Sequence, residues 1–222
     1  YFNAEGGIDR FHYGTVVNTL DKTINGKDNA NYPPSANNAS KTALTWRKYL
    51  DEQYANGIWN TNACPIVIRY AEVLLTYAEA VNELSGPSAD VYDKLDLIRG
   101  RVGMPKVDRE KYASKETLRR LIRRERGVEL AGEGVRRADI LRWKDDNGKM
   151  VAETVLNGVL ERVVGTVNYA ETDPTKRAEI DTNAPATDKK IEDRVFKVHN
   201  RYNPIPQGAI DNNPNLEQNA GY

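Results

Sequence analysis

Hydrophobic side chains recur at helical spacing in the middle of the chain, between Pro65 and Trp143. There apolar residues return every three or four positions, which predicts amphipathic helices. Prolines and glycines mark the ends, as at Gly86-Pro87 and Gly103. Short turns separate the first helix from the second and the third from the fourth, so we expect stacked antiparallel pairs. The expected helices cover approximately residues 65–84, 88–102, 114–131 and 135–143.

The first and third of these helices carry charge on largely apolar surfaces. In helix 65–84 polar residues recur at steps of three and four and apolar residues fill the remaining arc, so this helix should be covered on most sides. In helix 114–131 Glu125 falls on the apolar stripe. An unpaired buried carboxylate there would cost several kcal/mol, so we expect a bidentate arginine partner.

The segments on either side of the helical middle predict a different kind of structure. Residues 1–63 are rich in Asn, Gly, Tyr and Trp, and residues 144–222 contain short elements broken by proline and glycine, which indicates loops. Phe196 and Val198 alternate with charged neighbours, which predicts one small β-hairpin. The expected fold is therefore mainly α, with antiparallel helix pairs across residues 64–143 between two loop-rich segments.

The composition argues against several classes of function. The chain has 222 residues, 39% of them hydrophobic, which is enough for a sizeable core. The chain has 32 Lys plus Arg and 32 Asp plus Glu. Its net charge of zero argues against binding of nucleic acid or an anionic bilayer through overall charge. Cys64 is the only cysteine, so neither an intrachain disulfide nor a multi-cysteine metal site is expected. No apolar run approaches the roughly 20 residues that span a bilayer.

Catalytic and metal-binding patterns are missing. Only His12 and His199 could act as imidazole bases, and there is no Gly-x-Ser-x-Gly motif. The turn 132–134 lies between two helices and carries a carboxylate that would repel phosphate. Glu79 and Glu83 have a spacing that suits a carboxylate metal site, but no Glu-x-x-His partner exists, which favours a solvated or arginine-paired face. We predict no catalytic residue, no metal and no cofactor.

A dense arginine cluster in the third helix could in principle follow a phosphate backbone. Between residues 114 and 143 there are nine Lys or Arg and five Asp or Glu, and the acids are interleaved with the arginines. Interleaving favours internal ion pairs, so nucleic acid is not an expected partner.

The aromatic residues suggest a different ligand. Twelve Tyr and three Trp against three Phe form an amphipathic aromatic set. A sugar ring offers an apolar face that stacks on such rings and a rim of hydroxyls that Asn, Asp, Gln and Arg can bond. Most of the rings in residues 1–62 stand among asparagines, so this segment could bind carbohydrate.

Four ordered blocks make the chain recognisable. The first reads PIVIRYAEVLLTYAEA at 65–80, the second LIRGRVGMP at 97–105, and the third RRERGVELAGEG at 123–134 followed by RRADILRW at 136–143. The fourth is PIPQ at 204–207 with NPNLEQNAGY at 213–222. Together with RKYLD at 47–51, these blocks resemble the SusD/RagB family of outer-membrane nutrient-binding lipoproteins. A departure is Ala138, where the family frequently has an aromatic residue.

The resemblance implies the C-terminal half of such a protein, with part of a tetratricopeptide-like α-α superhelix. The N-terminal half, with its signal peptide and lipid-bearing cysteine, would be absent from this sequence, which opens at Tyr1. By resemblance the protein is a non-catalytic, surface-exposed lipoprotein of the Gram-negative outer membrane, held there only through its lipid anchor. It would bind oligo- or polysaccharide and deliver it to a SusC-like TonB-dependent transporter.

The resemblance also separates two sets of residues. The signature acids and arginines occur in family members with different ligands, so they are expected to be structural ion pairs: Glu125, Arg126, Glu129, Glu133, Asp139 and Arg142. Ligand contacts in the family come from variable aromatic loops. The ligand-binding residues expected here are Phe11, Tyr13, Tyr32, Trp46 and Trp59, with Asn31 and Asn60 as hydroxyl partners.

Three alternatives stay open at this point. The chain could be a helical scaffold that contacts only the transporter, or it could belong to the family members that bind peptides. It could also be a glycoside hydrolase, which would need two facing carboxylates. Shallow aromatic platforms predict affinities in the micromolar to millimolar range, roughly −8 to −4 kcal/mol.

Overall fold

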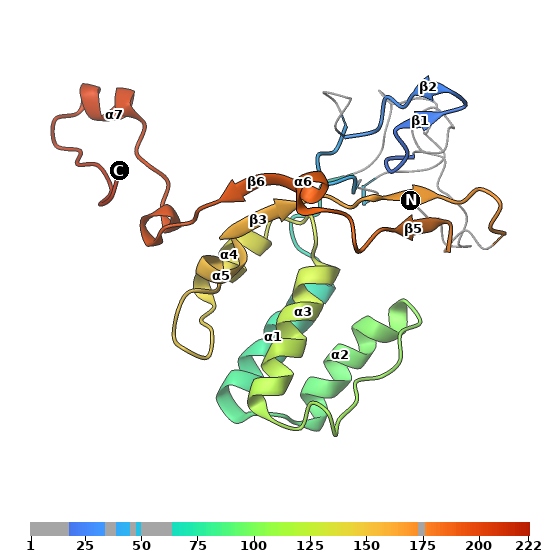
Figure 1. Cartoon of the computed structure of the whole chain (residues 1–222). Helices are drawn as coiled ribbons and strands as arrows, with labels where there is room; N and C mark the ends of the chain where they lie inside the picture. Colours follow the sequence, from blue (N-terminus) through green and yellow to red (C-terminus); the bar gives the residue numbers. More distant parts are fainter. Residues whose placement is uncertain (1–17, 34–38, 45–47, 50–63, 173–175) are drawn as a thin grey trace. The chain divides into compact units, whose positions relative to one another are not determined.

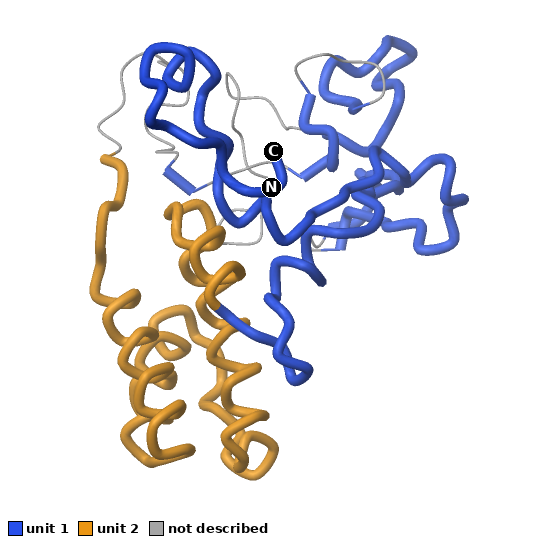
Figure 2. The backbone as a smooth tube through the Cα atoms, turned by 90° about the vertical axis from the view of Figure 1, so that its left-hand side faces the viewer, with its two compact units in different colours: residues 1–63, 143–222 blue, residues 64–142 orange. Residues whose placement is uncertain are grey.

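A computed structural model describes residues 18–33, 39–44, 48–49, 64–172 and 176–222. The chain divides into two compact units, shown in different colours in Figure 2. Residues 64–142 form one, called here the helical unit. Residues 1–63 and 143–222 form the other, called here the loop-rich unit. Within the described ranges no helix has the length and apolar character needed to cross a membrane.

The helical unit contains four helices (Figure 1): α1 (Tyr70–Ser85), α2 (Ala89–Arg101), α3 (Lys115–Glu129) and α4 (Arg136–Arg142). A turn of three residues joins α1 to α2, and α1 packs against both α2 and α3. Serine side chains cap two of the helices. Ser88 accepts a hydrogen bond from the backbone N–H of Val91, and Ser114 forms a capping box with Thr117. These four helices match the periodic stretches of the sequence.

The predicted start of the first helix is wrong by five residues. Residues 65–69 are not helical, and Arg69 is the N-cap of α1 with extended backbone (φ −145°, ψ 163°). Val67 and Ile68 are exposed, at 90% and 69% of their surface. The apolar run at 66–68 fits a helical pattern in the sequence. In the structure, the ion pairs of Arg69 described below hold this residue in the extended conformation.

The core of the helical unit is built from leucine-rich faces of α1, α2 and α3. Asn82 is also fully buried, and its Nδ2 donates to the backbone oxygen of Lys115 at 3.1 Å. The sequence predicts that α1 is covered on most sides. In the part of the chain that the structure describes, two of its faces are covered, but a third, apolar face is exposed. The buried core residues are Leu74, Leu75, Ala78, Val91, Tyr92, Leu95, Ile98, Val107, Leu118, Leu121, Ile122 and Leu130.

In its described residues, the loop-rich unit contains short helices and three two-stranded antiparallel pairs. Strand β1 (Thr23–Ile24) pairs with β2 (Lys27–Asp28), β3 (Gly158–Glu161) with β6 (Lys190–Arg194), and β4 (Gly165–Val167) with β5 (Ala178–Ile180). The helices are α5 (Val151–Val155), α6 (Ala186–Lys189), the 3-10 helix η3 (Val198–Arg201) and α7 (Gln207–Asn212). The predicted fold class, mainly helical with small strand pairs, is confirmed.

Strand pairs do form in the last third of the chain, but the predicted position at Phe196 and Val198 is wrong. Phe196 follows β6 and donates its backbone N–H to Oδ1 of Asn157 at 2.6 Å, and Val198 begins η3. Paired residues are 29 to 36 positions apart in β3–β6 and 11 to 15 positions apart in β4–β5, and β1 and β2 flank a tight turn. Local alternation therefore did not identify the strands. In β4, a side chain at Gly165 would meet the backbone oxygen of Glu179 at 2.2 Å, so only glycine fits this close pairing.

The C-terminal signature folds into a set of polar contacts. The side-chain amide of Gln218 bonds both backbone groups of Ile205, at 2.8 and 2.9 Å, and Nδ2 of Asn219 donates to the backbone oxygen of Asn203 at 2.7 Å. The hydroxyl of Tyr222 donates to the backbone oxygen of Tyr202 at 2.8 Å. This part of the signature therefore stabilises the chain end.

Candidate functional site

The most buried charges of the helical unit form a cluster around Asp139. Arg126 of α3 donates from Nε and Nη2 to the carboxylate of Asp139, at 2.9 and 3.3 Å, and from Nη1 to Oγ1 of Thr76 at 2.9 Å. Arg142 donates to Asp139 at 2.8 Å and forks onto both oxygens of Glu79 at 2.5 and 2.6 Å. These bonds raise the pKa of Arg142 above its ordinary value. The cluster joins α1, α3 and α4.

A second cluster fixes the start of α1. The Nε of Arg69 donates to the carboxylate of Glu133 at 2.8 Å, and its Nη1 donates to Glu129 at 2.6 Å. Arg101 of α2 adds a further bond to Glu129 at 2.8 Å. The hydrogen bond to Glu133 is the largest cause of a raised pKa of Arg69. Residues far apart in the sequence thereby hold α1, α2 and the end of α3 together.

Glu125, the acid on the apolar stripe of α3, pairs with an arginine from another helix. Nη1 of Arg99 in α2 donates to its Oε1 at 2.5 Å, and each side chain is exposed over only 11–12% of its surface. The partner is therefore not one of the interleaved arginines of α3, and the contact is a single bond instead of the expected bidentate one. Spacing within one helix could not show that partner, because it comes from the neighbouring helix.

A hollow of about 470 Å³ opens between α1, α3 and α4. Its wall includes the small side chains of Ala80, Val135 and Ala138, and an aromatic residue at position 138 would occupy this space. The carboxylates that reach it from Glu79 and Asp139 are bonded to arginines. Glu83, a third acid in the wall, pairs with Arg119, whereas Glu72 makes no ion pair in the described part of the chain.

The signature acids and arginines named from the sequence all lie in these ion pairs. Except for the Arg142–Asp139 pair within α4, each cited pair joins two different segments of the helical unit. Across the described ranges no group of three His, Cys, Asp or Glu side chains lies close enough to hold a metal ion. The arrangement supports a rigid scaffold in the helical unit.

Most of the residues expected to contact a ligand lie outside the described residues: Phe11, Tyr13, Trp46, Trp59 and Asn60. Tyr32 and Asn31 are described and belong to the loop-rich unit. Both are half-buried at the end of a turn organised by Asn29, whose side chain accepts from the backbone N–H of Asn31 at 2.9 Å.

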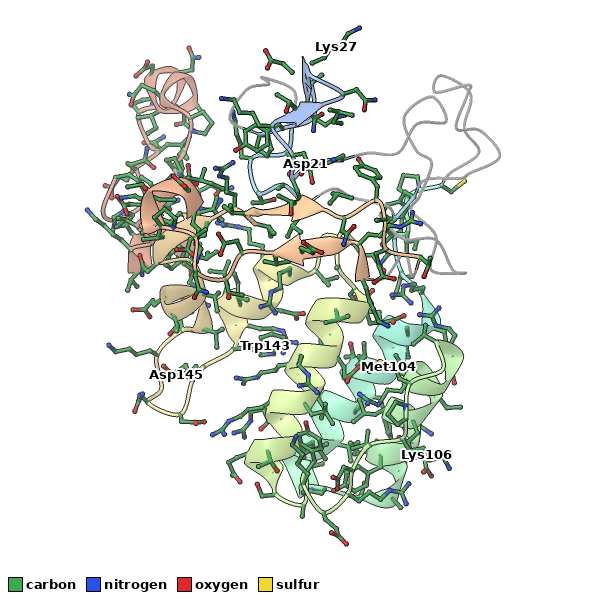
Figure 3. All side chains as sticks on the ribbon, turned by 45° about the vertical axis from the view of Figure 1, so that its right-hand side comes forward. Asp21, Lys27, Met104, Lys106, Trp143 and Asp145 are labelled. Atoms are coloured by element: carbon green, nitrogen blue, oxygen red, sulfur yellow. The ribbon has the colours of Figure 1, made fainter. Side chains whose placement is uncertain are left out.

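Hydrogen bonds of buried asparagines hold this turn in place. Asn29 donates to the backbone oxygens of Asn18 and Asp21 at 2.7 and 2.8 Å. Asp21, labelled in Figure 3, accepts a hydrogen bond from the backbone N–H of Val167 in β4 at 3.3 Å. The segment that carries Tyr32 is thus attached to the strand pairs of the same unit.

The ring of Tyr32 lies against an arginine that the sequence analysis did not select. The guanidinium carbon of Arg162 is 5.4 Å from the centre of the Tyr32 ring, within range of a cation–π contact. Nε of Arg162 donates to the backbone oxygen of Asp188. The Tyr32 ring and the Arg162 guanidinium, both half-buried, form a small amphipathic contact, and Asn31 adjoins Tyr32 in the chain. No sequence signal joins residues 32 and 162.

Comparison with known proteins gives the family. A SusD family model matches residues 9–222 of the chain. The chain belongs to the SusD family. Among curated relatives, SusD-like protein P25 of Formosa agariphila is 40% identical over 79 residues, or 35% of this chain, and SusD-like protein P2 of the same organism is 30% identical over 140 residues, or 58% of this chain.

The fold comparison agrees with the family. The crystal structure of a SusD-like protein from Bacteroides fragilis matches 71% of this chain with a TM-score of 0.52 and 28% identity. The matched regions are 15% and 28% of the two curated relatives and 26% of the crystal structure. The matched part of this SusD-family chain therefore covers between 15% and 28% of the length of these relatives.

Proposed function

We propose that this chain is part of a cell-surface glycan-binding protein that captures oligo- or polysaccharide and delivers it to a SusC-like TonB-dependent transporter. The observation that carries the proposal is the family match over residues 9–222. The surface at Tyr32, Asn31 and Arg162 supports it, because it combines a ring face with hydrogen-bonding groups, as sugars require.

Binding without catalysis is the second part of the proposal. The carboxylates of Glu79, Glu125 and Asp139 are engaged by arginines, which suits a structural role. A purified protein that hydrolyses no glycan in a panel, while it binds at least one, is the expected result. Hydrolysis that disappears in Glu125→Gln with the fold intact would contradict it.

Isothermal calorimetry with a panel of soluble glycans tests ligand binding directly. We expect dissociation constants in the micromolar to millimolar range, about −8 to −4 kcal/mol. Tyr32→Ala, Trp46→Ala and Trp59→Ala should each weaken binding at least several-fold without a change in thermal stability. Tyr70→Ala is the matched control, because Tyr70 is 70% exposed in the other unit.

Arg162 gives a sharper test of the described surface. Arg162→Lys keeps the positive charge but loses the planar fork that bonds neighbouring hydroxyls. If Tyr32 and Arg162 contact sugar together, this variant weakens binding as Tyr32→Ala does. Unchanged affinity in both variants would move the ligand site away from this surface.

The remaining alternatives have their own experiments. A folded chain that binds no glycan but co-purifies with the transporter would be a helical scaffold, and binding of peptides in the same calorimeter would place it with the peptide-binding members. We also propose that the complete protein is a surface-exposed outer-membrane lipoprotein. Membrane fractionation and the loss of surface labelling after mutation of the lipid-bearing cysteine test that location.

A further inference from the structure

Two basic side chains of the loop-rich unit are bonded only to neutral groups. Arg162 is half-buried, and its Nε donates to the backbone oxygen of Asp188. Lys189 is half-buried as well, and its Nζ donates to the backbone oxygen of Thr182 at 2.7 Å. Across the ranges that the structure describes, neither side chain makes an ion pair. The carboxylates of this unit therefore leave both positive charges without a counter-charge.

The two cations are neighbours across a strand pair. The backbone N–H of Arg162 donates to the backbone oxygen of Lys189 at 2.8 Å, directly beyond the Glu161–Lys190 pair of the β3–β6 ladder. Figure 1 shows these two strands side by side. Pairing of the strands thus brings two positive charges, 27 positions apart in the sequence, to one end of the ladder.

Burial distinguishes these two cations from the ion-paired basic residues. In the helical unit, the largely buried Arg69, Arg99 and Arg126 bond carboxylates at distances between 2.5 and 2.9 Å. In the loop-rich unit, the ion-paired Lys190 and Arg194 are exposed to water. Water screens a half-buried charge less than an exposed one, so the half-buried charge gains more from a counter-charge. A ligand could supply the counter-charge that the chain does not.

The contact with Tyr32 favours an anion at Arg162. The guanidinium carbon lies 5.4 Å from the centre of the ring, which attracts the positive charge without neutralising it. A guanidinium binds planar or tetrahedral oxyanions through two parallel N–H bonds, which an ammonium group does not form. A neutral sugar would leave this charge uncompensated, whereas a uronic acid or a sulfate ester would pair with it.

We propose that the glycan bound at Tyr32 and Arg162 is anionic, with a uronate carboxylate or a sulfate ester in contact with the Arg162 guanidinium. Lys189 adds a second positive charge that attracts the same anion. The inference rests on the proposed glycan-binding function and adds the charge of the ligand to it.

Matched oligosaccharides test the charge in calorimetry of the full-length protein. The uronate probes are oligogalacturonate and oligoglucuronate, each compared with its methyl ester, and the sulfated probes are carrageenan oligosaccharides, compared with their desulfated forms. We expect the charged member of one class to bind about ten-fold more tightly than its neutral partner, since it alone forms charge-assisted bonds. The class that shows the preference distinguishes a carboxylate from a sulfate. Raising NaCl from about 0.05 to 0.5 M should remove most of the preference through screening.

Variants assign the preference to this surface. Arg162→Gln should reduce it from ten-fold to about two-fold or less, and Arg162→Lys should retain part of it, because the charge remains without the fork. Lys189→Gln should weaken binding of the charged probe by about two-fold and leave the neutral probe unchanged. The matched control is Arg194→Gln, which removes an exposed, ion-paired cation of the same unit and should change neither affinity. Circular dichroism checks the folding of each variant, and the salt dependence of the unchanged protein needs no variant.

Two outcomes would overturn the inference while glycan binding stands. One is equal binding of the charged and neutral members of every pair, and the other is a preference for the charged member that survives Arg162→Gln. A folded protein that binds none of these glycans, charged or neutral, would instead overturn the proposed function on which the inference rests.

Discussion

Removal of the Asp139 carboxylate is the perturbation with the best-defined consequence. The side chains of Arg126 and Asp139 are exposed over only 5% and 4% of their surface, and two hydrogen bonds join them. In Asp139→Ala the guanidinium of Arg126 stays buried with Thr76 as its remaining close partner and a carboxylate oxygen of Glu79 at 3.9 Å. Arg142 is half-exposed, so water replaces the bonds that it loses.

The magnitude follows from the two bonds to Arg126. A hydrogen bond to a charged group contributes about 1.5–3 kcal/mol, and breaking one side of a buried pair costs about 3–5 kcal/mol. Because Thr76 and Glu79 retain part of the solvation of Arg126, we expect Asp139→Ala to lower the free energy of unfolding by about 3 kcal/mol. The loss is large beside the roughly 5–15 kcal/mol that stabilise a typical domain.

Urea unfolding followed by the helical circular dichroism signal measures this loss. Asp139→Asn keeps the shape and one acceptor and should cost less than Asp139→Ala. The double variant Arg126→Met with Asp139→Ala should recover part of the loss, since no buried charge is then left alone. A loss for Asp139→Ala below about 0.5 kcal/mol, the usual range of surface substitutions, would refute the assignment of this pair as a buried clamp.

Three further predictions concern the same helices. Glu125→Ala should cost about 2 kcal/mol in urea unfolding, because Arg99 loses its partner in a largely buried position, and a neutral result would place both groups in solvent. Ser114→Ala should cost about 1 kcal/mol through loss of the capping box, whereas Ser114→Asp should restore it. Arg119 holds the pKa of Glu83 below its ordinary value of 4.5, so the stability from this pair is present above that value and is lost as the pH falls below it. The pH dependence of the urea midpoint should therefore flatten at its acid end in Glu83→Gln, and an unchanged profile would contradict the pairing.

Local sequence signals predicted where the helices lie, but they did not predict the contacts between helices. The start of α3 at Ser114 and the end of α2 before Gly103 could be predicted, since capping and positive φ depend on residues a few positions apart. The partner of Glu125 could not, because Arg99 lies 26 positions away on another helix. The start of α1 was missed because it depends on the ion pairs of Arg69 with residues 60 and 64 positions away.

The candidate ligand surface shows the same division. The choice of Tyr32 and Asn31 rested on composition and on family resemblance, both of which are properties of the sequence. Arg162 joined them only through the tertiary structure, since it reaches the Tyr32 ring across 130 positions. The sequence by itself determined the family, the helical class and most helix ends, because these depend on local periodicity and ordered motifs. Tertiary structure decided which arginine neutralises which acid and which face of α1 stays open, because pairing and burial depend on residues that only folding brings together.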